Sequence, residues 1–257
     1  MDANLMAGFS PAILRQKMMA PVELDAYLMQ IAQRHETHRF LGGATQGLYV
    51  RMVDFLASQF LKPGKKIKVL DWGCGKGHIS YLLKQRGFNV VSCDIQSSDP
   101  DSAFAQATPI LSEQSIPVVA LTHPSALPFA DGEFDLVVSF GVLEHVHDDQ
   151  ASLQEIRRIL KPGGVFFFSF LPYWLSWTQR LAHLRGNYYH PILYRKSRIA
   201  EMAKQSTMSL IYITHGQLLP KNSLGNSAAL EKFDRILTHW TPLKHFATNL
   251  EGFMVAT

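Results

Sequence analysis

The sequence predicts an α/β fold in which helices cover both faces of a doubly wound, mostly parallel sheet. Three observations support this. Apolar stretches typical of strands alternate with helical patterns along the chain. The apolar stretch 67–70 leads into a glycine-rich turn over 71–77, and a helical pattern follows over 78–86. The stretch 89–93 then ends at Asp94, which completes one β-α-β unit.

The other elements follow from the same patterns. Residues 1–60 carry apolar positions at helical spacing, for example over 22–28, and Pro63-Gly64 ends this region before the first strand. We predict strands at 67–71, 89–94, 117–121, 135–140, 165–170, 209–214 and 252–256. We predict helices at 78–86, 150–160, 195–206 and 227–239.

Two segments, 171–194 and 215–250, fall outside the minimal alternation of strands and helices. Ligands of open α/β sheets bind beyond the carboxyl ends of the strands, so we interpret these insertions as a substrate cap. We expect one domain with three parts. These are an N-terminal helical cap over 1–62, a ligand-binding core over 63–170, and the rest of the sheet with its insertions over 171–257.

Composition limits the class of protein. The 257 residues, 47% of them hydrophobic, suit one α/β domain with added helices. The sequence contains no uninterrupted run of 18 apolar residues, so we expect no transmembrane helix. The first ten residues lack a signal-peptide pattern, and we expect Cys74 and Cys93 to be reduced thiols in a cytoplasmic protein. The net charge of +4 permits anionic substrates or an anionic membrane surface, and it does not require nucleic acid.

The glycine turn excludes two common phosphate-binding patterns. Its glycines are Gly73, Gly75 and Gly77, which is not the spacing of a dinucleotide fingerprint, and Lys76 is not followed by Ser or Thr as in a Walker loop. The pattern Asp-x-Gly-x-Gly-x-Gly, which begins at Asp71, resembles motif I of the class I S-adenosylmethionine (SAM) methyltransferases. SAM carries a sulfonium and a zwitterionic methionine end but no phosphate, which suits an acid and bare backbone amides.

Three later segments extend this resemblance in the family's order. Residues 126–139 resemble its "LPF…FD-V" segment, 141–146 its "LEH" segment, and 153–164 its helix and "LKPGG" turn. Together with the glycine turn they span roughly 67–170, and they are most similar to the small-molecule branch that includes the quinone-biosynthesis methyltransferases. The resemblance implies a Rossmann-like, seven-stranded sheet whose last strand is antiparallel, with SAM as cofactor.

Asp94 lies at the tip of the second strand, where a carboxylate can accept hydrogen bonds from both ribose hydroxyls. The resemblance implies direct backbone approach to SAM at Gly73 and Gly75; for Gly77 the alternative is a role in helix packing alone. Asp71 would orient the glycine turn or the amino group of SAM, or be purely structural, and Cys74 would place a small side chain beside the ligand. The remaining predicted cofactor-binding residues are Ile95, Ala126, Leu127 and Phe140.

The chain departs from the family at two positions. His123 stands where an acid usually faces adenine, so backbone groups near Ala126 are an alternative adenine contact. The resemblance implies that relatives which hold a divalent cation carry an acid two residues before the Leu of "LEH". In this chain that position is Gly141, which has no side chain to bind a metal, so we predict no metal site. We predict His145 and His190 as catalytic base or substrate contacts; the alternative is that both are structural.

These observations favour a SAM-dependent methyltransferase acting on a small-molecule, glycan or lipid-linked acceptor, with O-methylation by in-line displacement. The alternative is a non-catalytic SAM-binding regulatory or assembly protein. Residues 139–142 lack the Asp/Asn-Pro-Pro-aromatic motif typical of base methylation, so nucleic acid is not expected. Aromatic and basic residues over 174–198 suggest peripheral membrane contact, a pocket for an anionic or lipid-linked substrate, or an ordinary amphipathic cap. No oligomeric state is predicted.

Overall fold

The computed structural model describes residues 22–35, 41–95, 109–187, 190, 192–220 and 228–257. Its centre is a seven-stranded sheet of order β3-β2-β1-β4-β5-β7-β6. The strands are β1 (Lys68–Trp72), β2 (Asn89–Ile95), β3 (Val118–Leu121), β4 (Phe134–Phe140), β5 (Leu160–Pro172), β6 (Met208–His215) and β7 (Asn249–Ala256).

The first five strands pair in parallel, and β7 runs antiparallel to both β5 and β6. The predicted doubly wound, mostly parallel sheet with an antiparallel last strand is therefore confirmed. Strands β1 to β6 all end at one edge of the sheet, which we call the carboxyl edge. This is where ligands of such sheets bind.

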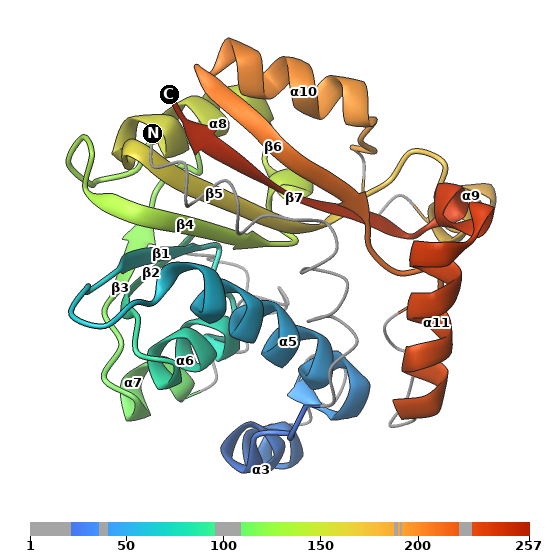
Figure 1. The fold of residues 1–257 in the computed structure, drawn as a ribbon, viewed down its shortest axis with the longest axis horizontal. Coiled ribbons are helices and arrows are strands. Elements are labelled where there is room, and N and C mark those ends of the chain that lie inside the picture. Colours follow the sequence, from blue (N-terminus) through green and yellow to red (C-terminus); the bar gives the residue numbers. More distant parts are fainter. Residues whose placement is uncertain (1–21, 36–40, 96–108, 188–189, 191, 221–227) are drawn as a thin grey trace.

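Helices cover both faces of the sheet (Figure 1). On one face lie α3 (Ala26–Arg34), α5 (Gly43–Phe60), α6 (His78–Gln85) and α7 (Ile110–Glu113), and on the other lie α8 (Asp149–Ile159) and α10 (Lys196–Gln205). The helices of the two insertions, α9 (Trp177–Leu184) and α11 (Ala228–Trp240), lie beyond the carboxyl edge. Two short 3-10 helices are η1 (Leu143–His145), after β4, and η3 (Pro242–Phe246), before β7.

The core has two layers because strand residues alternate in direction. Val69 and Val138 pack toward α5 and α6, whereas their neighbours Leu70 and Val137 pack toward α8 and α10. All four side chains are fully buried. Burial on both faces is the physical reason that these strands appear in the sequence as continuous apolar runs.

The N-terminal region contributes to this core. Phe55 of α5 is 1% exposed and stacks on Phe253 of β7 at 5.6 Å between ring centroids. The helical pattern expected over 22–28 is only partly realised, because α3 begins at Ala26, where the Asp25 carboxylate accepts the Leu28 N–H at 3.0 Å. The predicted helix over residues 1–21 lies outside the described part of the chain.

Two other element predictions need correction. Helix α9 was not predicted within 171–194; Ser176 begins it by accepting the Gln179 N–H at 3.2 Å. Strand β5 begins five residues earlier than expected, because Leu160 already pairs with Phe134 before a bulge shifts the register. The missed helix matters for function, because α9 lies at the carboxyl edge.

The buried acidic side chain of Glu251 lies under α5. Glu251 of β7 is 4% exposed and lines a small cavity under α5 with Met52, Phe55 and Tyr212. Burial raises the pKa of the Glu251 carboxyl to about 7, and a hydrogen bond from Ser169 opposes part of that shift. The folded protein therefore holds a proton on this group at a pH where the unfolded chain releases it.

Replacing Glu251 with Gln should flatten the pH dependence of stability. Because the folded-state pKa is raised from 4.5 to about 7, the wild-type contribution is present below pH 4.5 and is lost as the pH rises through about 7. This amounts to about 3 kcal/mol of unfolding free energy. Urea denaturation between pH 4.5 and 7.5 measures it, with exposed Glu201→Gln as control. An unchanged slope in Glu251→Gln would contradict the assignment.

Candidate functional site

The glycine turn is anchored to the neighbouring strand β2. The backbone N–H groups of Gly73 and Cys74 donate to the carbonyl oxygen of Cys93 at 2.9 and 3.0 Å, and the Gly77 N–H donates to the Cys74 carbonyl at 2.8 Å. Gly73, Gly75 and Gly77 have φ angles of 74°, 49° and 76°. These left-handed conformations are strained for other residues, which explains the glycines at alternate positions.

The three glycines face different surroundings. A Cβ on Gly73 would collide with the side chain of Val142, and a Cβ on Gly77 would lie 2.6 Å from Leu111. A Cβ on Gly75 would meet no atom of a described residue within 4 Å. Gly73 and Gly77 are therefore also required for packing, and the backbone of Gly75 faces open space where a ligand can approach.

Asp94, at the tip of β2, lies directly against this open position. Its carboxylate accepts the Gly75 N–H at 2.5 Å and the Ile95 N–H at 2.7 Å. Burial raises the pKa of the Asp94 carboxyl, and the two backbone N–H groups oppose that shift. Each carboxylate oxygen keeps a further lone pair, so the side chain can still accept from a ligand hydroxyl. Ile95 is 44% exposed beside it.

Asp71 lies beneath the turn rather than beside its open side. It is 1% exposed, and burial raises its pKa to about 7. Ser80 of α6 donates to its carboxylate at 2.5 Å, and Ser92 of β2 donates to the Ser80 hydroxyl at 2.8 Å. This network ties β1, α6 and β2 together, which supports the predicted role of Asp71 in orienting the turn.

The two cysteines are also beneath the turn. Cys74 and Cys93 are free and buried, and burial raises the pKa of both thiols. They are therefore held in the protonated form, which is a poor nucleophile and a poor metal ligand. Cys74 acts as a small apolar side chain at this position.

The adenine-side segment has a defined hydrogen-bond pattern. The Ser125 backbone N–H, which can only donate, points at Nδ1 of His123 at 3.3 Å. If this contact is a hydrogen bond, the neutral His123 ring has its proton on Nε2. Nε2 is then a donor and cannot accept a hydrogen bond from the adenine amine. The N–H of Ala126 donates to the His123 carbonyl, and that of buried Leu127 to Glu155. The Leu127 carbonyl oxygen already accepts from Arg158 and from the Phe129 N–H, both at 2.8 Å. Of Ala126 and Leu127, Ala126 is therefore the better placed to offer a carbonyl oxygen to a ligand.

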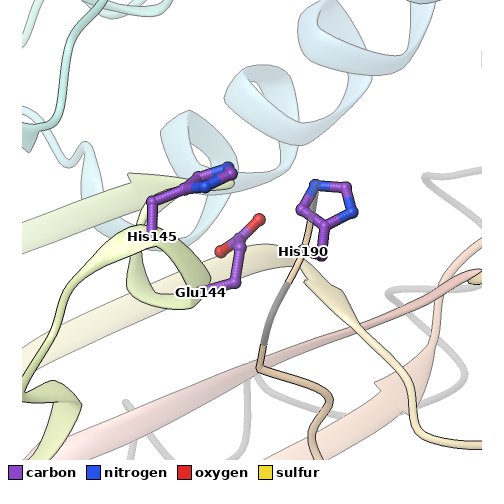
Figure 2. A group of neighbouring side chains, drawn as sticks. All are labelled: Glu144, His145 and His190. Atoms are coloured by element: carbon purple, nitrogen blue, oxygen red, sulfur yellow. The ribbon is translucent and has the colours of Figure 1, made fainter. Parts of the chain in front are cut away.

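The two predicted catalytic histidines lie side by side. Glu144 and His145 are on η1 after β4, and His190 comes from the insertion after β5. Their ring centroids are 5.3 Å apart, and one ligand-type atom from each of Glu144, His145 and His190 lies within 4.8 Å of the others. Figure 2 shows the Glu144 carboxylate between the two imidazole rings.

Two residues that were not among the predicted site residues hold this group in place. The Tyr194 hydroxyl lies 3.0 Å from the Leu143 carbonyl oxygen and 2.9 Å from the Asp149 carboxylate, so it anchors η1. The side-chain amide of Gln179, on α9, lies 2.9 Å from Nδ1 of His190. Gln179 was missed because α9 itself was not predicted, and a lone Gln in an insertion has no distinguishing pattern.

The chemistry available to this group is that of a base or a metal site. Desolvation lowers the pKa of His145 below its usual value of 6.5, so its imidazole is neutral at pH 7 and can accept a proton. Glu144, His145 and His190 are also residue types that bind divalent transition metals. The sequence predicted no metal because Gly141 has no side chain, and it did not indicate that His190 lies beside the pair.

Val142 connects the two halves of the site. Its side chain packs against Gly73 of the glycine turn, and its carbonyl oxygen accepts the His145 N–H at 2.9 Å. At the end of strand β4, Phe140 packs against Tyr49 of α5 at a centroid distance of 6.1 Å, and Tyr49 packs against Phe170 at 5.6 Å. Phe140, predicted to bind the cofactor, therefore lies within an aromatic wall at the end of β4.

The cap surface combines apolar and basic side chains. Trp177, Leu181 and Leu184 of α9 are 39%, 37% and 85% exposed. Trp174 lies under the guanidinium of Arg195, at 3.9 Å from its ring centroid. Peripheral membrane contact stays a prediction here; Tyr188 and Tyr189, on which it also relied, lie outside the described residues. Within the described ranges, no helix is long and apolar enough to cross a membrane.

Known proteins resemble this chain in sequence and in fold. Residues 70–168 match a family described as "Methyltransferase domain". A ubiquinone biosynthesis O-methyltransferase of Pseudomonas aeruginosa is 34% identical over 102 residues, which cover 40% of this chain and 43% of that protein. The chain thus matches less than half the length of this relative.

Two solved structures share the fold. The first is the methyltransferase in a complex with the Haloferax volcanii Trm112 methyltransferase activator, at 15% identity and a TM-score of 0.56, covering 92% of this chain and 99% of that one. The second is the 1,6-didemethyltoxoflavin-N1-methyltransferase of Burkholderia thailandensis, at 18% identity and a TM-score of 0.54, covering 93% of each chain.

The sheet order and the match over residues 70–168 define the fold of a class I methyltransferase domain. Residues 70–168, which match the methyltransferase-domain family, make this part of the chain a distant relative of the ubiquinone biosynthesis O-methyltransferases.

Proposed function

We propose that the whole chain transfers a methyl group from SAM to an oxygen atom of a small-molecule acceptor. The observation that carries this proposal is that His145 and His190 lie together and that the His145 N–H is bonded to Val142, whose side chain packs against Gly73 of the glycine turn. The likeness to O-methyltransferases supports an oxygen acceptor. The likeness to an N1-methyltransferase makes nitrogen the alternative.

The residues divide into binding and proton-transfer roles. Asp94 would accept from the ribose hydroxyls, the Gly75 backbone would allow close approach, and the aromatic wall around Tyr49 would exclude water from the acceptor. When SAM is bound, it supplies a methyl group already activated on sulfur. The protein mainly aligns the acceptor oxygen with that group and removes the acceptor proton.

Either histidine could remove the proton. Although the His145 side chain is exposed, partial desolvation by the surrounding protein lowers its pKa below 6.5, which favours the neutral ring at pH 7. His190 can accept at Nε2 when its Nδ1–H is donated to the Gln179 side-chain oxygen, which a 180° rotation of the amide brings to the same place. Gln179 would then select the basic tautomer of His190 and orient its ring.

A metal-assisted variant uses the same residues in another way. If Glu144, His145 and His190 held a divalent cation, it would lower the pKa of the acceptor hydroxyl directly. Activity that disappears after chelator treatment and returns with Mn²⁺ or Zn²⁺ would establish this variant. Full activity after exhaustive chelation would establish the histidine base.

Formation of S-adenosylhomocysteine (SAH) tests the function itself. We expect the protein to bind SAM and SAH in calorimetric titrations, and to form SAH from SAM when a panel of phenols, glycans and lipid-linked phenols is offered. Amine analogues of the active phenols distinguish oxygen from nitrogen acceptors. SAM binding without SAH formation from any acceptor would favour the non-catalytic regulatory or assembly protein.

A further inference from the structure

A second group of ionisable side chains lies at the carboxyl edge, at the end of β6. His215 is 5% exposed, and Nζ of Lys196 lies 3.4 Å from its Nδ1. The ring of His245, on η3, lies 5.4 Å from the His215 ring. Lys244 precedes His245, so four basic residues from α10, β6 and η3 converge; we call them the basic cluster.

The basic cluster concentrates positive charge in a partly desolvated place. Lys196 and Lys244 are both half-buried. Burial lowers the pKa of Lys196, and the positive charge of Lys244 lowers it further. Among the residues with described placement, neither lysine forms an ion pair with a carboxylate. Two neighbouring cations without a counter-ion destabilise the fold, and a bound anion would remove that cost.

The basic cluster is connected to the catalytic group. The Tyr173 ring contacts the His215 ring at 5.0 Å between centroids, and Tyr173 forms a backbone bridge with Tyr194. The Tyr194 hydroxyl in turn reaches the Leu143 carbonyl, next to Glu144. An acceptor that extends from the histidine pair along this edge would therefore meet the basic cluster.

We propose that Lys196, His215, Lys244 and His245 bind a phosphate or diphosphate group carried by the methyl acceptor. Two ammonium groups and two imidazoles offer several N–H donors and at least two charges, which match the dianionic, multi-oxygen character of a phosphate better than a single carboxylate. This deepens the proposed function and rests on it, because it assigns the acceptor to a class of phosphorylated or diphosphate-linked molecules.

Calorimetric titration with inorganic diphosphate and with phenyl phosphate at low salt tests the site directly. We expect the wild type to bind both, with affinity that falls as salt is added. Lys196→Gln and Lys244→Gln should each weaken binding roughly tenfold or more, because each removes a charge-assisted hydrogen bond. Lys204→Gln, an exposed lysine on the same helix, is the matched control and should bind as the wild type does.

Titration of the same samples with SAH separates this proposal from the proposed function. A wild type that binds SAH but no phosphate, or a Lys196→Gln/Lys244→Gln variant that binds phosphate as tightly as the wild type, overturns the anion site alone. Phosphate binding without SAH binding leaves the anion site standing and contradicts the proposed function. Sedimentation with phosphatidylglycerol vesicles shows whether a lipid headgroup or a free phosphate ester is the source, since only the former would carry the wild type down.

Discussion

Replacing Asp94 with alanine should weaken SAH binding by roughly 5- to 150-fold. The reason is that the carboxylate would accept the ribose hydroxyls and at the same time holds the Gly75 and Ile95 backbone N–H groups in place. Loss of such a contact corresponds to about 1–3 kcal/mol of binding free energy. Calorimetric titration of the wild type and the variant with SAH measures the change.

Two further variants make this test specific. Asp94→Asn should also lose affinity, because an amide has only one acceptor oxygen and cannot serve both backbone N–H groups. Asp54→Ala removes an acid of α5 that pairs with Arg86, and it should leave SAH affinity unchanged. A folded Asp94→Ala protein with wild-type affinity would show that the cradle does not hold the ribose.

The second large effect is expected at the histidine pair. Replacing the catalytic base, His145 or His190, with alanine should lower kcat by roughly 10²- to 10⁴-fold, whereas SAH affinity should change little. Gln179→Leu should give a smaller loss if His190 is the base, because it removes the group that selects the tautomer. Steady-state rates at saturating SAM, with an identified acceptor, measure these changes.

The pH profile gives an independent reading of the same group. A histidine base accepts a proton only when neutral, so kcat should fall as the pH drops through its pKa. For His145, desolvation places that fall below pH 6.5. Exposed His147→Ala is the nearby control and should keep both the rate and the profile. Wild-type rates in both His145→Ala and His190→Ala would remove the pair from the mechanism.

The binding half of the site was predictable from sequence because it is local. Gly73, Gly75 and Gly77 lie within one turn that needs left-handed backbone at each position. The position of Asp94 beside this turn follows from the parallel pairing of β2 with β1, because parallel strands bring their carboxyl ends together. The strands were predictable as well, because strands buried on both faces appear in the sequence as continuous apolar runs.

For the proposed catalytic group, the sequence predicted which residues take part but not that they lie together. His145 and His190 were both candidates, yet only the folded insertion brings His190 beside Glu144. The sequence also missed α9 and its Gln179, because the helix spans only eight residues inside a segment that was interpreted as an irregular insertion. The predicted exclusion of metal relied on Gly141 alone and did not consider a ligand from the insertion.

By itself the sequence determined the class of fold and the glycine turn with Asp94 beside it, because backbone geometry and strand burial are encoded in neighbouring residues. Only the tertiary structure decided which distant side chains meet. The packing of η1, α9, α10 and η3 at the carboxyl edge joins Glu144 to His190 and Lys196 to His215. Such contacts depend on how insertions fold over the sheet, and spacing along the chain carries no information about them.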